Sequence, residues 1–327
     1  MCSIFGLLDY KGTLRPEERL RIIRILSTAA EMRGTDATGI AYVKENRMHI
    51  QKAPRPAHEM RYRIEPETRY IMGHTRMTTQ GSEKKNYNNH PFQGKAGGVP
   101  FALAHNGVLY NDHELRRSRR LPQTKIETDS YVAVQLIERQ GELSAQSLKW
   151  MAEALHGSFT ITVLDGENNL YLVKGNNPVA LYLFPQRGFY LYASTTEILN
   201  MALKALRMDK EFYTVIKVGQ GEIMQIDPIG KRTVSRFDDS ALWQHSYYSF
   251  SHWTSPMSKK KPYEADSYLE EVVQYGVSRG VSESELNLLI EAGYDAFDLE
   301  ELLYDPELRQ CCVDEIVGDQ MCELMCH

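Results

Sequence analysis

The sequence predicts an α+β protein, in which helices cover the faces of β-sheets, followed by a small helical module. Three observations support this class: short apolar strand patterns occur in runs of unequal length, helical patterns separate those runs, and no internal repeat is present. The 327 residues, 42% hydrophobic and 25% charged, suit one or two globular domains. The longest apolar runs are too short to span a membrane, so we expect a cytoplasmic protein.

The first half of the chain mixes strands and helices. The apolar run 2–8 predicts a strand, and Pro16 begins a helix whose apolar residues recur as far as Ala30, with Gly34 just beyond its end. The other strands expected here are 38–43, 48–52, 70–75 and 101–105, and the other helices are 129–139 and 145–155.

The second half is rich in strands, and one helix interrupts them at 196–206. The strands expected here are 159–164, 170–173, 180–184, 189–193, 212–218, 222–226 and 231–237. Alternating and continuous apolar runs of five to seven residues are typical of strands that are buried on one or both faces.

The chain is predicted to divide near residue 240, with a linker over 238–263 and an acidic helical module over 264–327. Ser282 and Glu285 match a capping box, Gly293 is a stop signal, and a further helix is expected from 305 to about 318. The module has 17 acidic and two basic residues, whereas the rest of the chain has 26 acidic and 36 basic ones. The acidic module either docks on the basic body and limits access to it, or is a solubilising or partner-binding appendage.

Cys2 follows the initiator methionine and has a small side chain, which favours removal of Met1. It then becomes an N-terminal cysteine, whose free α-amine, with a reference pKa near 7.7–8.0, can take the proton of its own thiol. Taken alone, Cys2 is better explained as a small buried residue at the start of a strand.

Four further segments change that interpretation: 33–39 (RGTDATG), 73–81 (GHTRMTTQG), 105–107 (HNG) and 127–129 (ETD). Each stands at the end of a strand or helix, where backbone N–H groups are free and glycine permits close approach. Together with Cys2, they resemble the glutaminase domain of class II glutamine amidotransferases, over about residues 2–237. The resemblance implies a four-layer αββα N-terminal-nucleophile hydrolase fold, and it implies hydrolysis of the side-chain amide of glutamine through a thioester on Cys2.

The resemblance also implies the roles of the other site residues. Asn106 and Gly107 are expected to form the oxyanion hole, although an Asn-Gly pair alone would indicate a tight turn. Arg76 is expected to bind the α-carboxylate of glutamine and Asp129 its α-ammonium; their ordinary alternatives are a surface salt bridge and an N-cap. The loop containing Thr79 and Gln80 is expected to cover the substrate.

Two residues of this loop depart from the family pattern: Met77 replaces a frequent aromatic residue, and Gln80 a frequent histidine. The departures put loop closure and communication with an acceptor site in doubt. Arg33 and Asp36 are expected to brace the loop. The basic run 116–120 is expected near the rim of the site, with a solvated helix end as its alternative.

No cofactor or metal is expected. The terminal cysteines Cys311, Cys312, Cys322 and Cys326 lack the paired spacing of zinc ligands. The aromatic and basic residues of the linker (Tyr247, Tyr248, Phe250, Trp253 and Lys259–Lys261) make nucleic-acid binding conceivable, but a tether packed on the body is favoured.

The chain shows no phosphate-binding loop or recognisable synthetase signature, so a stand-alone glutaminase is predicted, whose acceptor is either another protein or water. The alternatives are an N-terminal-cysteine hydrolase of another γ-glutamyl or acyl amide, and a catalytically silent regulatory module.

Overall fold

The computed structural model describes residues 2–240, 242 and 265–292, together with residues 294, 299, 302, 303, 306, 309, 310, 312–314, 316 and 317. The chain divides into two compact units, Met1–His245 and Ser246–His327. Most of the predicted linker lies outside the described residues, so the domain boundaries at 237 and 264 stay a prediction.

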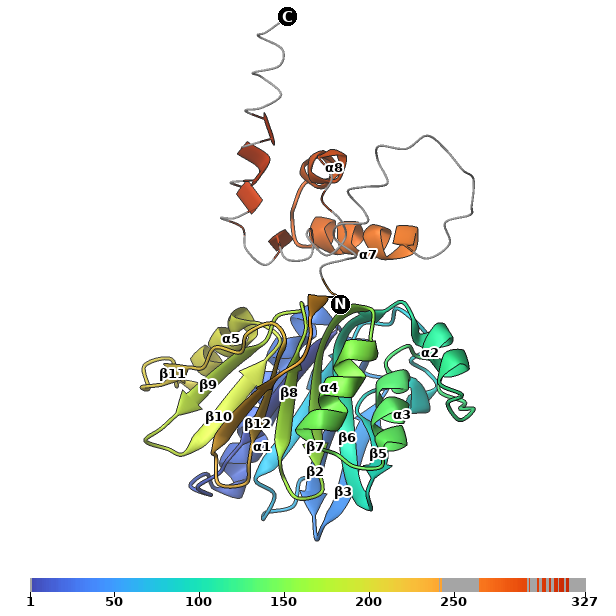
Figure 1. The fold of residues 1–327 in the computed structure, drawn as a ribbon. Helices are drawn as coiled ribbons and strands as arrows, with labels where there is room; N and C mark the ends of the chain where they lie inside the picture. The colour runs from blue at the N-terminus through green and yellow to red at the C-terminus, as the bar shows by residue number, and fades with distance from the viewer. Residues whose placement is uncertain are drawn as a thin grey trace, which may run out of the picture. The chain divides into compact units, whose positions relative to one another are not determined.

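The first unit contains two antiparallel sheets stacked face to face (Figure 1). Its seven-stranded sheet has the order β11-β9-β10-β1-β4-β2-β3. These strands are β11 (Thr214–Val215), β9 (Ala180–Phe184), β10 (Phe189–Ala193), β1 (Ser3–Leu8), β4 (Tyr70–Arg76), β2 (Ala37–Lys44) and β3 (Arg47–Ala53).

The six-stranded sheet has the order β13-β12-β8-β7-β6-β5. Its strands are β13 (Arg232–Arg236), β12 (Glu222–Ile226), β8 (Leu170–Lys174), β7 (Gly157–Asp165), β6 (Val99–Leu109) and β5 (Phe92–Ala96).

Helices cover the outer face of each sheet. On the seven-stranded sheet lie α1 (Pro16–Ala29) and α5 (Thr196–Leu206), and on the six-stranded sheet lie α3 (Tyr131–Gln140) and α4 (Ala145–Ala154). The shorter helices of this unit are α2 (Asp112–Ser118), η1 (Ala30–Arg33), η2 (Ala57–Glu59) and η3 (Asn86–Asn88).

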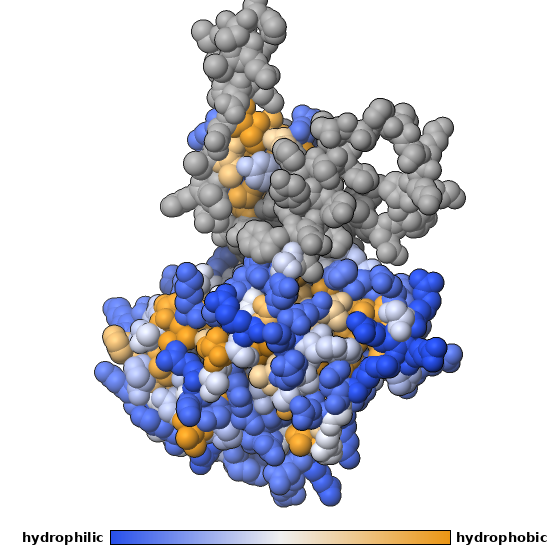
Figure 2. Space-filling view, viewed as in Figure 1, coloured by the Kyte–Doolittle hydropathy of each residue, from blue (hydrophilic) through white to orange (hydrophobic). Residues whose placement is uncertain are grey.

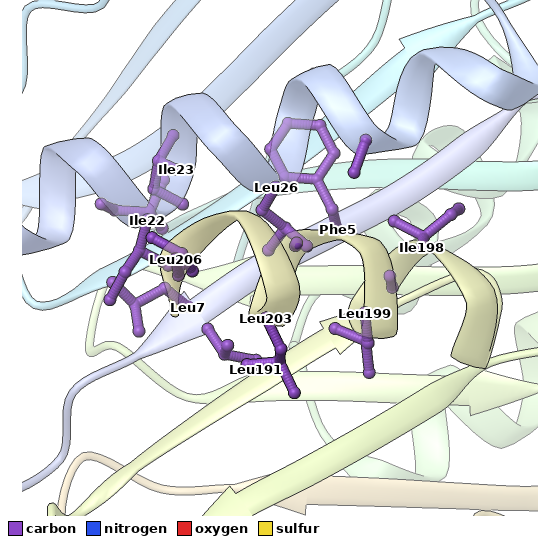
Figure 3. Close-up of a cluster of buried hydrophobic side chains, with 14 of the residues drawn as sticks. Phe5, Leu7, Ile22, Ile23, Leu26, Leu191, Ile198, Leu199, Leu203 and Leu206 are labelled. Carbon is purple, nitrogen blue, oxygen red and sulfur yellow. The ribbon is translucent and has the colours of Figure 1, made fainter. Parts of the chain in front are cut away.

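Three hydrophobic clusters fill the three spaces between these four layers. Because side chains alternate along a strand, Phe5 and Leu7 of β1 pack under α1 and α5, whereas Ile4 and Leu8 enter the space between the sheets. Figure 3 shows Leu26 of α1 and helix α5 packed over this face of the sheet. The predicted α+β, four-layer αββα architecture is therefore confirmed.

Some elements differ from the prediction. Strand β6 continues to Leu109, four residues beyond its expected end. The strand expected over 212–218 is reduced to the two residues of β11. The other residues of this segment, apart from Val218, are partly or fully exposed. Strand β5 and helix α2 were not predicted.

The second unit has a small core of its own. Helices α7 (Ala265–Ser278) and α8 (Glu283–Glu291) pack through residues that include Val272, Leu286 and Leu289. The Ser282 side chain accepts a hydrogen bond from the Glu285 N–H, as the capping pattern predicts. The predicted stop at Gly293 and the bounds of the last helix lie outside the described residues. No helix among the described residues is long and apolar enough to cross a membrane.

Candidate active site

Strand alternation brings Arg76 and Asn106 into the space between the sheets. Met72 of β4 faces this space, so His74 and Arg76, two and four residues further on, face it too. Ala104 of β6 also faces this space, and Asn106, two residues further on, therefore faces it as well. Both polar residues lie at the end of the space where β1 begins, because Thr75 pairs with Ser3, directly after Cys2.

One arginine holds Cys2 and Asn106 together. The buried Arg33 side chain at the end of η1 donates from Nε to the Cys2 carbonyl oxygen at 2.8 Å, and from Nη2 to Asn106 Oδ1 at 3.4 Å. From the sequence we expected Arg33 to brace the loop, and its contacts with Cys2 and Asn106 were not predicted.

Asn106 is left with an amide donor that has no acceptor. A guanidinium can only donate hydrogen bonds, so its contact places Oδ1 toward Arg33 and the NH₂ group on the other side. The residue is 1% exposed, and Nδ2 has no hydrogen-bond partner among the described residues. Its backbone oxygen accepts from Asn177 Nδ2 at 2.9 Å, which fixes the strand at this point. Such a buried donor without an acceptor is costly unless a ligand uses it.

Gly107 lies within strand β6, paired with Phe159 of β7, and is not part of a tight turn. Its φ of +138° is unusual for other residues, and a Cβ atom there would stand 2.0 Å from the Ser158 carbonyl oxygen. The turn that an Asn-Gly pair usually indicates is therefore excluded, and glycine is required by close approach.

The Cys2 thiol stays protonated at rest. Its Sγ donates to the Met77 carbonyl oxygen at 3.4 Å. Burial raises the pKa of this thiol, which the positive charge of Arg76 opposes and the negative charge of Asp129 reinforces. Attack by this sulfur therefore requires a base that removes its proton.

Arg76 is a buried cation without an ion pair. It is 3% exposed, and no carboxylate among the described residues lies within salt-bridge distance. Its Nη1 donates to Asn88 O at 3.1 Å and Asn89 Oδ1 at 2.6 Å. Its Nη2 donates to Gln80 O at 2.5 Å and Gly81 O at 3.1 Å. The alternative of a surface salt bridge is excluded, because Arg76 is buried and all of its partners are neutral oxygens. This is unusual, since a buried guanidinium group normally faces a carboxylate.

The Asp129 side chain forms hydrogen bonds both with the end of strand β6 and with the start of helix α3. It precedes Ser130, the N-cap of α3, and is therefore not the N-cap itself. One carboxylate oxygen accepts from Leu109 N at 2.7 Å, and the other accepts from the N–H and hydroxyl of Ser130 at 2.7 and 3.1 Å. A carboxylate has about four acceptor positions, so one remains for a further donor.

The loop after β4 is attached to the site at several points. The Asp129 N–H donates to Gln80 Oε1 at 2.8 Å, and Thr78 N donates to Asp36 Oδ2 at 2.7 Å. Asp36 thus braces the loop as expected from the sequence. Thr79, expected to contact substrate, is exposed.

The basic run 116–120 lies on and just after α2, and its members differ. Arg116 donates from Nη2 to the carbonyl oxygen of Thr128, the neighbour of Asp129, at 3.0 Å. Arg117, Arg119 and Arg120 are exposed. Arg116 therefore supports the rim of the site, while the other arginines match the alternative of a solvated helix end.

Sequence reasoning missed the buried amides Asn88, Asn89 and Asn177. Asn88 Nδ2 donates to Glu127 Oε2 at 2.8 Å, and Asn88 Oδ1 accepts from Glu127 N at 3.0 Å. This pair ties the segment before Asp129 to the oxygens around Arg76. The adjacent Asn88 and Asn89 could have been recognised from the sequence, since asparagine side chains often form hydrogen bonds with nearby backbone groups. No sequence pattern pointed to Asn177.

Three buried histidines stand behind the site. His74 Nε2 lies 3.0 Å from the His105 carbonyl oxygen, and its ring contacts that of His90 in a tilted arrangement with the ring centroids 4.2 Å apart. Burial lowers the pKa of His74 to about 3 and also lowers the pKa values of His90 and His105. All three rings are therefore neutral at pH 7.

The arrangement combines a partly buried thiol, a free amide donor, a buried unpaired cation and one carboxylate with an open acceptor position. It suits nucleophilic attack on the amide of a substrate that carries an amino-acid head group. No group of three or more potential metal ligands gathers in the part of the chain that the structure describes. Of the terminal cysteines only Cys312 is described, and it packs against the core of the second unit.

Comparison with known proteins agrees with this geometry. Residues 74–201 match the family model of the glutamine amidotransferase domain. The chain is 30% identical over 232 residues to glutamine–fructose-6-phosphate aminotransferase (isomerizing) from Geobacillus kaustophilus, covering 68% of this chain and 35% of that protein. It is 31% identical over 199 residues to the enzyme of the same name from Sulfurisphaera tokodaii, covering 58% and 33%. The chain thus spans about a third of the length of these relatives.

Among solved structures, glutamine phosphoribosylpyrophosphate amidotransferase from B. subtilis superimposes with a TM-score of 0.58 at 20% identity. The match covers 72% of this chain and 49% of that one, and it shows the shared fold. With the motifs, the four layers and the family match in agreement, the chain carries a class II glutamine amidotransferase domain of the N-terminal-nucleophile hydrolase fold.

Proposed function

We propose that this protein hydrolyses glutamine to glutamate and ammonia, with Cys2 as the nucleophile once Met1 is removed. The observation that carries the proposal is the attachment of Cys2 and Asn106 to the same Arg33 side chain, with the amide donor of Asn106 unused. Attack on an amide carbonyl requires a nucleophile, here the thiol, and a hydrogen-bond donor beside it that stabilises the oxyanion.

The reaction begins when Cys2 Sγ attacks the side-chain amide carbon of glutamine, while the free α-amine of Cys2 takes the thiol proton. The raised pKa of the thiol makes this base necessary. The carbonyl oxygen becomes an oxyanion, which the Nδ2 group of Asn106 and the N–H of Gly107 stabilise. Loss of one such donor costs about 2.7–4 kcal/mol.

The ammonium on Cys2 then returns its proton to the amide nitrogen, the C–N bond breaks, and ammonia leaves. Water, deprotonated by the same amine, adds to the γ-glutamyl thioester. Collapse of this second intermediate breaks the C–S bond and releases glutamate, with the sulfur regaining its proton. The sum is glutamine plus water giving glutamate plus ammonia.

The head group of glutamine is recognised by Arg76 and Asp129. Arg76 supplies the positive charge for the α-carboxylate, which replaces one or both of the loop oxygens now bound to Nη2. Asp129 uses its open acceptor position for the α-ammonium. Gln80 acts through its side-chain bond to Asp129, and Thr79 belongs to the loop that covers the substrate.

The ammonia acceptor is a separate partner enzyme in this proposal. The curated relatives are named as transferring the amide nitrogen to a sugar phosphate, and this chain matches about a third of their length. The second unit contains small helices with a core of their own. The predicted cytoplasmic location stays a prediction.

The test is to incubate the purified, Met1-processed protein with glutamine and measure glutamate and ammonia, with Cys2→Ala as the matched control. We expect equimolar products from the wild type and none above background from the variant. Release from another γ-glutamyl or acyl amide, but not from glutamine, would support the alternative hydrolase. No release from any amide would support the regulatory module.

A further inference from the structure

A groove of about 540 Å³ opens at the edge of the first unit, away from the candidate active site. It is lined by residues of β10, β12 and β13, by the segment that begins in β11, and by the turn between β12 and β13. The edge strands of both sheets therefore border it, since β11 ends one sheet and β13 ends the other. Its volume lies within the usual range of binding pockets.

The floor of the groove is rigid. Tyr190 and Met224 are buried there, at 2% and 3% exposure. The Tyr190 hydroxyl donates to the Gly230 carbonyl oxygen at 2.9 Å, which fixes the turn that forms one wall. The shape is thus built into the sandwich and needs no partner to form.

The groove carries an excess of positive charge. Lys217, Lys231 and Arg232 line it, and no acidic residue does. The carboxylate of Asp227 accepts from the backbone N–H of Lys231 at 2.8 Å, and no ion pair joins the side chains of the three cations to another described residue. Three cations around one concavity attract an anionic partner at low and moderate salt.

Exposed hydrophobic side chains gather at the same place. Among residues 2–240, six large hydrophobic side chains are exposed, and four of them belong to this edge: Phe212, Val215, Ile229 and Val234. Val215 and Val234 line the groove itself, at 59% and 48% exposure. Figure 2 shows hydrophobic surface over the edge of the body where β11 lies. Apolar patches rimmed by charge mark protein interfaces more often than small-ligand sites.

The backbone of the bordering strands adds a third feature. Among the described residues, β11 pairs with β9 alone and β13 with β12 alone, so each has one side without a described sheet neighbour. An extended peptide can add to such an edge through main-chain hydrogen bonds and place alternate side chains into pockets.

The groove is remote from the chemistry. Tyr190 pairs with Leu8, at the opposite end of β1 from Cys2. Six residues of extended strand separate Leu8 from Cys2, which is about 20 Å. An occupant of the groove therefore leaves the Cys2 end of the molecule accessible.

We propose that this groove docks an extended acidic segment of a partner protein, in which apolar residues alternate with carboxylates. The carboxylates meet Lys217, Lys231 and Arg232, and the apolar residues cover Val215 and Val234. A small anion would satisfy the cations but leave the hydrophobic surface exposed. The proposal goes beyond glutamine hydrolysis, because it assigns a recruitment surface for a second protein.

The test uses the full chain and three labelled hexapeptides, with alternating Glu and Val, Glu and Ser, or Lys and Val. Binding is followed by fluorescence anisotropy at 20 mM and 150 mM salt. The charge-reversal variant is Lys217→Glu/Lys231→Glu/Arg232→Glu. Its matched control is Arg47→Glu/Arg55→Glu/Arg61→Glu, three exposed arginines on and after β3, at the opposite edge of the seven-stranded sheet.

We expect saturable binding of the Glu–Val peptide, weakened by salt and by about tenfold or more in the groove variant, and little changed in the control variant. A second variant, Val215→Ser/Val234→Ser, should lose the preference for Glu–Val over Glu–Ser. Glutaminase activity should remain in all three variants, which separates this proposal from the proposed function.

Three results would overturn the proposal. No saturable binding to the full chain would remove the docking site. Equal loss in the groove and control variants would show that only overall charge matters. Equal affinity for Glu–Ser and Glu–Val would reduce the groove to a general anion site, without a role for its hydrophobic surface.

Discussion

The hydrogen bond from Arg33 fixes the orientation of the Asn106 amide, and this orientation leaves the Nδ2 donor available in the candidate site. Because a guanidinium has no acceptor, the contact from Arg33 selects the orientation in which Oδ1 is used and Nδ2 is free. The same side chain holds the Cys2 carbonyl oxygen, so Cys2 and Asn106 share one support. Arg76 complements them with a buried charge that has only neutral partners.

At the residue scale, Asn106→Ala and Arg76→Lys should affect different kinetic constants. Asn106→Ala should lower kcat by about 10²–10³ with a smaller effect on KM, because its donor acts mainly on the oxyanion. Arg76→Lys should mainly raise KM, roughly tenfold or more, because one ammonium replaces a two-pronged grip. Steady-state kinetics with glutamine measure both constants, and the reverse pattern would mean that the roles are wrongly assigned.

Retention of Met1 should silence the enzyme as fully as loss of the thiol. With Met1 in place the thiol is present, but the adjacent amine that serves as its base is not free. The measurement is glutaminase activity of a form with an uncleaved N-terminal tag, beside the processed protein, with intact mass and circular dichroism as controls. Normal activity of the tagged form would exclude the N-terminal amine as the base.

At the element scale, the loop after β4 depends on a few fixed points, and Asp36 is the one that the sequence identified. Its Oδ2 accepts from Thr78 N at 2.7 Å, next to the Met77 carbonyl that contacts Cys2. The loop therefore positions both the thiol and the oxygens around Arg76.

Asp36→Ala should raise KM several-fold and increase proteolytic cleavage within the loop, with little loss of global stability because the residue is exposed. Asp36→Asn keeps an acceptor at the same place and is the matched control, so it should stay close to wild type. Kinetics and limited proteolysis check the pair. Equal effects of both variants would mean that the charge, not the hydrogen bond, holds the loop.

The histidines of β4, β6 and the segment before β5 predict a loss of stability in acid. The pKa of His74 is about 3 in the folded protein, and those of His90 and His105 are also lowered, against about 6.5 in an unfolded chain. Below pH 6.5 the unfolded state binds protons that the folded state does not, so the free energy of unfolding falls as pH falls.

For His74 the expected slope approaches about 1.4 kcal/mol per pH unit between pH 6 and pH 4, and the lowered pKa values of His90 and His105 add to it in the same direction. Denaturant unfolding at a series of pH values measures it. His105→Gln should reduce the slope, and the same replacement at the exposed His113 is the surface control. A flat profile from pH 7 to pH 4.5 would contradict the neutral buried cluster.

At the scale of the whole molecule, all residues of the candidate active site belong to the first unit, and the second unit has a separate core. The acidic and basic parts of the sequence coincide approximately with these two units. The chemistry is therefore expected to reside in the first unit alone.

A chain that ends at residue 245 should keep glutaminase activity within a few-fold of the full chain. The comparison at low and moderate salt also tests the hypothesis that the acidic module limits access. Inhibition by the module predicts a rise in activity on truncation that is greatest at low salt. Equal activity of both chains under both conditions would leave the module as an appendage. An inactive but folded truncated chain would contradict the assignment of the chemistry to the first unit.

The periodicity of the sequence determined most of the elements, because strands buried on both faces and helices with one apolar face leave local patterns. β1, β9 and α5 were predicted to within a residue or two. Strand β5 was missed because Gln93, Gly94 and Lys95 interrupt its apolar pattern. The strand over 212–218 was overpredicted: Tyr213, Ile216 and Val218 pack against the core, but only Thr214 and Val215 pair with β9.

The sequence by itself indicated the family and predicted the set Cys2, Arg76, Asn106, Gly107 and Asp129, since these residues stand in recognisable motifs at the ends of elements. Only the tertiary structure decided how they are supported. Arg33 lies 73 residues from Asn106, and Asn177 lies 71 residues from it, so no local pattern couples them. The groove between the two sheet edges is likewise a product of strand order. Contacts between distant segments depend on how strands pair and how sheets stack, and a single sequence carries no periodic signal for either.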